Sequence, residues 1–228
     1  MNIIKTITSL LMISLIIGCS STPSKPTIIV ETGKVGMIGF GSLMSLKRTE
    51  DVFNHKYRDS VYLVHLEGYQ RSWDYVTSNY DEQVYTNEDL KYDRYYIRDN
   101  DTILYNNTIY LNIREQPNTS MNCVLYMVTE EEIKDMDLYE YGYERIDVTE
   151  QIAEYNFQGG KVFAYKATSN YLYNSKNTNG LTVIEQEYFD LVTSACDSIG
   201  LGFRQEYDAT TNPLNLELVA PVIWKKVR

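Results

Sequence analysis

Residues 38–44 read Ile-Gly-Phe-Gly-Ser-Leu-Met, at the end of a strand-like run over 35–40 and just before a weak helical pattern over 46–53. Two glycines one residue apart let the backbone approach a ligand closely, and amide N–H groups near a helix start suit a carboxylate or an oxyanion. Met44 stands where a dinucleotide-binding GxGxxG pattern has its third glycine, and no P-loop ending follows. The residues alone leave open a tight strand-to-helix turn or an anion-binding turn.

A second stretch, residues 136–145, reads Met-Asp-Leu-Tyr-Glu-Tyr-Gly-Tyr-Glu-Arg. It follows Thr129 and Glu132, whose spacing is typical of a capping box and predicts a helix start. Glu140 lies where this helix runs into a glycine-containing turn, among three tyrosines. Such a carboxylate can be desolvated, which raises its pKa toward neutrality. The alternative is an ordinary solvated acid of an acidic helix.

The rest of the chain predicts one domain, with either an α+β fold or a small barrel that has helices on its outside. Short strands are expected over 61–66, 72–77, 108–113, 122–128 and 161–167. A second capping-box spacing at 182–185 predicts another helix, with Ile184, Tyr188, Leu191 and Ala195 on its apolar face and a stop at Gly200. Residues 78–107, rich in Tyr, Asn and Asp, are expected to form a long surface excursion that could cover a site.

Composition excludes several functional classes. The 228 residues carry 21 Lys+Arg against 31 Asp+Glu, a net charge of −10, which argues against nucleic-acid partners. Three cysteines without CxxC spacing and only two histidines predict neither a zinc site nor a Ser-His-Asp triad. Cys123 and Cys196 are expected to be small core residues, and a disulfide between them is the alternative.

The N-terminus has the pattern of an export signal. An apolar run over residues 7–18 would span about 18 Å as a helix, against the roughly 30 Å of bilayer hydrocarbon. It is therefore expected to be a signal peptide. Ile-Ile-Gly-Cys at 16–19 resembles the bacterial lipobox. This resemblance implies that Cys19 is diacylated and anchors the protein to a membrane of the cell envelope, the outer membrane in a Gram-negative host. A plain secretory signal is the alternative.

Three blocks of sequence resemble the γ-glutamylcyclotransferase superfamily, especially its ChaC-type members. Gly-Phe-Gly-Ser-Leu-Met at 39–44 is similar to the family's (F/Y)GYGSLM turn. Leu-Glu-Gly-Tyr-Gln-Arg-Ser-Trp at 66–73 is similar to its LxGYxRxF/W strand, and residues 123–143 resemble its segment ending in Glu-x-Gly-Tyr. The blocks occur in the family's order over residues 37–149. Phe40 departs from the family's tyrosine, which removes a hydroxyl group but leaves the backbone role.

The resemblance implies a small mixed β-barrel with peripheral helices over 28–228, after a signal peptide (1–18) and a tether (19–27). It also implies that Glu140 is the catalytic glutamate, and that the turn holding the γ-glutamyl group consists of Ile38, Gly39, Phe40, Gly41, Ser42 and Leu43. The implied reaction cyclises a small γ-glutamyl substrate to 5-oxoproline and needs neither cofactor nor metal. Gly68, Tyr69, Arg71 and Trp73 carry over as a motif without an assigned role, and Arg71 is expected to anchor the sheet or to pair with an acid.

Two functions remain open from the sequence. One is an enzyme in which Glu140 takes a proton from the substrate α-amine and returns it to the leaving nitrogen. The other is a lipoprotein that uses the same pocket to bind a small ligand or an envelope partner without catalysis. A carboxylate at position 140 favours the enzyme. The sequence indicates no oligomeric state.

Overall fold

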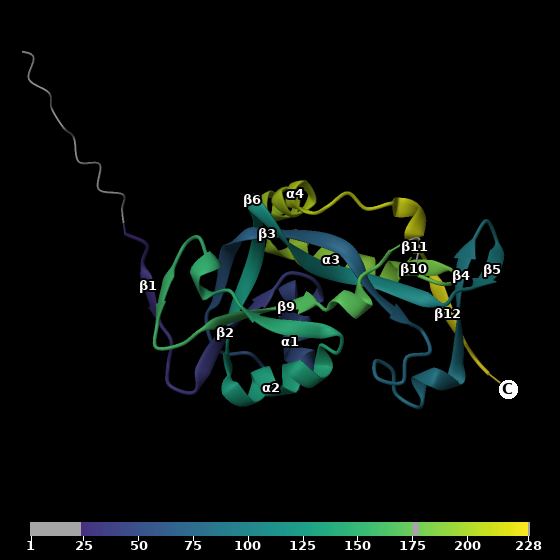
Figure 1. Cartoon of the computed structure of the whole chain (residues 1–228), viewed down its shortest axis with the longest axis horizontal. Coiled ribbons are helices and arrows are strands. Elements are labelled where there is room, and N and C mark those ends of the chain that lie inside the picture. The colour runs from purple at the N-terminus through teal and green to yellow at the C-terminus, as the bar shows by residue number, and fades with distance from the viewer. Residues whose placement is uncertain (1–23, 175–177, 228) are drawn as a thin grey trace, which may run out of the picture.

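The computed structural model describes residues 24–174 and 178–227. Its main sheet has seven strands in the order β11-β10-β6-β2-β9-β7, with β3 paired to β6 beside this path. β3 and β6 are long and antiparallel, and they run across the molecule in Figure 1. The strands are β2 (Lys34–Gly39), β3 (Val61–Ser78), β6 (Asn107–Thr129), β7 (Tyr143–Asp147), β9 (Val162–Ala167), β10 (Thr182–Glu185) and β11 (Val219–Ala220).

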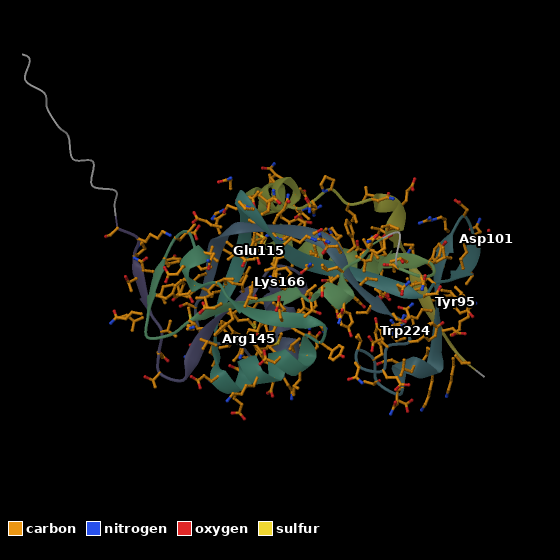
Figure 2. The ribbon with its side chains drawn as sticks, in the orientation of Figure 1. Tyr95, Asp101, Glu115, Arg145, Lys166 and Trp224 are labelled. Atoms are coloured by element: carbon orange, nitrogen blue, oxygen red, sulfur yellow. The ribbon has the colours of Figure 1, made fainter. Side chains whose placement is uncertain are left out.

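Two small sheets lie at opposite ends of the molecule (Figure 1). One pairs β1 (Thr27–Ile29) with β8 (Asn156–Gln158) in parallel. The other joins β12 (Val222–Lys226), β4 (Tyr92–Arg98) and β5 (Asp101–Leu104), and Figure 2 shows Tyr95, Asp101 and Trp224 at this end. The expected surface excursion over 78–107 therefore contains the β4–β5 hairpin, which the sequence did not predict. The strand that completes this small sheet, β12, comes from the C-terminal end of the chain, so no local pattern marks the sheet.

Four helices pack around the main sheet in the described part of the chain: α1 (Leu46–Phe53), α2 (Glu130–Tyr139), α3 (Gln186–Ile199) and α4 (Leu201–Thr210). In Figure 1, α2 and α4 lie on opposite sides of the strands. The core between them is apolar, with Met37, Ile109 and Leu125 at most 1% exposed. The α+β class is therefore confirmed. Strand pairing within 24–174 and 178–227 runs in an open order, so the expected barrel is not closed by hydrogen bonds.

The first predicted capping box is confirmed and the second is wrong. Thr129 Oγ1 accepts the Glu132 N–H at 3.1 Å, and the Glu132 carboxylate accepts the Thr129 N–H at 2.6 Å. Residues 182–185 instead form β10, because this β-branched run pairs in parallel with both β6 and β11. The helix begins only at Gln186 and lacks a side-chain cap.

The four central strand predictions merge into two long strands. Residues 61–66 and 72–77 both belong to β3, and residues 108–113 and 122–128 both belong to β6. A register shift between Glu67 and Tyr69 interrupts the pairing, and Gly68 there has φ of 78°. The gap between the predicted strands 61–66 and 72–77 thus contains a bulge within one strand.

The structure also decides whether Cys123 and Cys196 are core residues or form a disulfide. Cys123 and Cys196 are buried and unpaired, so no disulfide joins them. Cys19 and the expected signal peptide lie outside the described residues. Within the described residues, every helix is too short or too polar to cross a bilayer.

Candidate active site

The glycine turn is built by close backbone packing at the end of β2. A Cβ on Gly39 would lie 2.4 Å from the Leu43 carbonyl oxygen, so only glycine fits there. The chain then enters the 3₁₀ helix η1 (Ser42–Met44), and Ser45 caps α1 by accepting the Arg48 N–H at 3.3 Å. Among the described residues, the amide N–H groups of Ser42 and Leu43 have no acceptor. They are therefore free to bind an anionic group.

Arg71 fixes the orientation of this turn. Its side chain is fully buried, and Nε donates to the Phe40 carbonyl at 3.1 Å. The two terminal nitrogens donate to Asn122 on β6 and to Thr210 on α4. Because a trans peptide holds its N–H opposite its C=O, this bond turns the Gly41 N–H away from Arg71. The guanidinium forms no ion pair with a described carboxylate, so it anchors the turn and does not pair with an acid.

Glu140 is positioned by the end of α2. Its N–H donates to the Met136 carbonyl at 2.8 Å, and its carbonyl accepts the Tyr143 N–H at 3.1 Å. Gly142 has φ of 81°, and a Cβ there would lie 2.8 Å from Tyr75 Oη. The glycine therefore permits both the left-handed turn and the close approach of Tyr75. This turn leads into β7 and leaves the Glu140 side chain facing two adjoining cavities.

The smaller cavity, here called the recess, has a volume of about 40 Å³. Glu140 lines it together with Ile38, Phe40, Gly41, Ser42 and Leu43, so it brings together all the catalytic and substrate-binding residues expected from sequence except Gly39. Gly39 does not line the recess; its missing Cβ leaves room for the Leu43 carbonyl oxygen, which makes the turn possible. A volume of this size holds a group such as a carboxylate or a carbonyl oxygen.

The larger cavity, here called the chamber, has a volume of about 310 Å³ and also includes Ser42 and Glu140. Its walls are largely aromatic and include six tyrosines: Tyr75, Tyr110, Tyr139, Tyr141, Tyr143 and Tyr188. Several are fixed by hydrogen bonds from their hydroxyls, such as Tyr75 to the Tyr141 carbonyl at 2.6 Å and Tyr143 to the Leu111 carbonyl at 2.7 Å. The predicted excursion contributes Gln83 and Val84 to the chamber wall.

The electrostatics of Glu140 follow from these walls. Burial raises the pKa of Glu140 from 4.5 to about 7, and the positive charge of Arg48 offsets part of this rise. Its carboxylate has no hydrogen bond or ion pair within the described ranges, so nothing else compensates the lost hydration. At neutral pH this carboxyl can both accept and release a proton.

Sequence reasoning did not identify Arg48, Tyr75, Tyr110 or Tyr188 as site residues. Arg48 lies in the predicted helix directly after the glycine turn, and this adjacency was the one available signal. Tyr188 was assigned to an apolar helix face, and its ring contacts that of Tyr110 edge-on at 4.9 Å. The other tyrosines come from β3 and β6, whose pairing the sequence did not reveal. The described residues contain no cluster of three or more His, Cys, Asp or Glu that could hold a metal.

Comparison with known proteins yields matches among solved structures alone. No family model matches the sequence, and no curated protein does so significantly. One matching structure is described as a gamma-glutamyl cyclotransferase, with 14% identity, a TM-score of 0.45, and coverage of 80% of this chain and 91% of that chain. An uncharacterized protein from Homo sapiens has 14% identity, a TM-score of 0.47, and coverage of 80% and 90%. A yeast gamma-glutamyl cyclotransferase specific to glutathione has 10% identity, a TM-score of 0.42, and coverage of 81% and 100%. The chain is similar to these proteins at a level that assigns no residue a role.

Proposed function

We propose that the chain is a γ-glutamylcyclotransferase-like enzyme that converts the γ-glutamyl group of a peptide or amide into 5-oxoproline and releases the amine. The observation that carries the proposal is Glu140, whose pKa is about 7 and whose side chain lines both the recess of the glycine turn and the chamber. Resemblance of the three sequence blocks supports the same activity.

The reaction has a simple balance of bonds and protons. The substrate α-amine forms a bond to the γ-carbonyl carbon, and the bond from that carbon to the leaving nitrogen breaks. An α-ammonium group, with a pKa of about 8, must first lose a proton, and Glu140 accepts it. Glu140 then gives this proton to the leaving nitrogen. Ring closure leaves a second proton on the ring nitrogen, and this proton passes through Glu140 to the released amine, which departs as an ammonium. The free amides of Ser42 and Leu43 stabilise the negative charge on the carbonyl oxygen or bind the α-carboxylate.

Positioning supplies much of the expected rate. The attack is intramolecular, so a site that holds the γ-glutamyl chain bent brings the amine close to the carbonyl. The recess receives one polar end of this group, and the chamber has room for the remainder of the substrate. The tyrosine-lined walls reduce the access of water to Glu140, in agreement with its raised pKa.

The experiment is release of 5-oxoproline from a panel of γ-glutamyl dipeptides, glutathione and γ-glutamyl amines. Glu140→Gln should lower the rate by about a hundredfold or more while the protein stays folded. The matched control is Glu144→Gln, because Glu144 lies on the exposed side of β7 and pairs with Lys166. A Glu140→Gln protein as active as the parent would refute the role of Glu140. No product from any substrate would favour the non-catalytic binding function.

We also propose that the protein is exported and anchored to the cell envelope through a lipid on Cys19. The support is the lipobox-like sequence at 16–19. Cys19→Ser should move the protein from the membrane fraction to the soluble fraction, and Ser20→Ala should leave it bound. Equal membrane binding of both variants would contradict the anchor.

A further inference from the structure

The chamber contains one positive charge. Of the described residues that line it, Arg48 is the single cationic side chain and Glu140 the single anionic one. Arg48 lies in the first turn of α1, which starts immediately after the glycine turn. Its position therefore depends on the same backbone that forms the recess.

Arg48 has hydrogen-bond donors that the protein does not use. Nη2 donates to the Tyr139 hydroxyl, while Nε is buried and has no partner among the described residues. Arg48 forms no ion pair with a carboxylate in the described part of the chain, although Glu140 lies close enough to feel its charge. A guanidinium has five donors in a planar fork that matches a carboxylate. Because this guanidinium lines the chamber without a carboxylate partner among the described residues, its unused donors can bind an acceptor on a ligand there.

The arrangement of the two cavities indicates which carboxylate of a substrate could reach Arg48. The free amides are at the recess, where the γ-glutamyl group is expected, and Arg48 lines only the chamber. Glu140 lines both cavities, and in the proposed reaction it gives its proton to the leaving nitrogen. The groups beyond that nitrogen must therefore extend into the chamber toward Arg48.

We propose that Arg48 binds the carboxylate of the leaving group, so that the preferred substrates are γ-glutamyl amino acids or peptides with a free carboxylate and not γ-glutamyl amines. This inference rests on the proposed cyclotransferase function. Arg48 is a specificity residue here, and Glu140 remains the group that transfers the proton.

The test compares γ-glutamyl-leucine with γ-glutamyl-leucinamide, which have the same size and differ in the terminal charge. The parent should prefer the carboxylate by about tenfold or more in kcat/KM, since charge-assisted hydrogen bonds are among the strongest. In Arg48→Met this preference should disappear, mainly through a higher KM for γ-glutamyl-leucine. Arg48→Lys should keep part of it, because lysine retains the charge but not the fork. The control is Lys47→Met on the same helix, where Lys47 is 80% exposed and pairs with Asp51.

Each outcome decides the inference. If both substrates lose activity equally in Arg48→Met, with the preference unchanged, Arg48 binds the γ-glutamyl group or supports the fold, and the inference is wrong. If the parent cyclises both substrates equally well, the inference is wrong and the cyclotransferase function stands. If the parent releases 5-oxoproline from neither substrate nor from the wider panel, the cyclotransferase function itself fails. Thermal unfolding of each variant shows whether it is folded.

Discussion

Glu140 should make the stability of the protein depend on pH in an unusual direction. Its pKa is about 7 in the folded state and 4.5 in the unfolded state. Between these values the folded state binds more protons, so the free energy of unfolding falls as pH rises through this window. At pH 8 the loss is on the order of 3 kcal/mol, because a shift of one pKa unit corresponds to about 1.4 kcal/mol. Glu140→Gln should therefore be more stable than the parent at pH 8 and equally stable at pH 4, as measured by urea unfolding. Parallel curves at all pH values would indicate a solvated carboxylate.

Gly39 allows a second test at the level of single residues. In Gly39→Ala the new Cβ meets the Leu43 carbonyl oxygen at 2.4 Å, and this backbone atom cannot move without distorting the turn. We expect a loss of about 2 kcal/mol or more in the free energy of unfolding. Gly202→Ala is the matched control, because Gly202 lies in α4 with no atom within 4 Å of its Cβ position. It should gain about 0.5–1 kcal/mol from helix propensity. Equal effects of both changes would refute the steric role of Gly39.

At this scale the sequence indicated more of the candidate site than of its surroundings. Glu140 and the turn at 38–43 could be found because they are contiguous motifs, and the structure brings five of the six turn residues to the recess. Arg48 and Tyr75 could not be found, because the chamber wall depends on how distant elements pack. A lone arginine in a short helix gives no sign of an unpartnered Nε.

Three elements are connected through one histidine. His65 on β3 bonds through Nδ1 to Glu154, which precedes β8, and through Nε2 to Glu206 on α4 at 2.6 Å. Burial lowers the pKa of His65, but the hydrogen bonds to the two carboxylates outweigh it and raise the pKa above 6.5. Protonated His65 is therefore favoured by folding. Its contribution is fully present below pH 6.5 and is lost as pH rises through the folded pKa.

His65→Gln tests this connection between elements. The ring is 39% exposed, so screening by solvent limits the effect to under about 1 kcal/mol. The variant should be destabilised relative to the parent at pH 5.5 and much less so at pH 9, as measured by thermal unfolding in buffers of equal ionic strength. A destabilisation that is the same at both pH values would show that the ring contributes packing and not charge.

At the scale of the whole molecule, the fold depends on pairings between distant segments. The α+β class and most strand positions could be predicted, because alternating apolar residues mark them locally. The pairing of β12 with β4 could not, since neither strand encodes its partner. α4 was also missed, because Gly202 inside it weakens the helical pattern. The bulge at Gly68 resembled a strand end, because a glycine there weakens the local strand pattern in the same way.

The two core cysteines allow a test of the packing of the whole domain. Cys123 and Cys196 are each 0% exposed and unpaired, and burial raises the pKa of both thiols to about 12. At neutral pH they are therefore protonated and shielded, so they react only when the protein unfolds. In a Cys19→Ser protein, a thiol reagent should label neither cysteine in the native state and both in denaturant. The melting temperature should not change with reductant. A melting temperature that falls in reductant would indicate a disulfide, and native labelling of either thiol would indicate a core that opens locally.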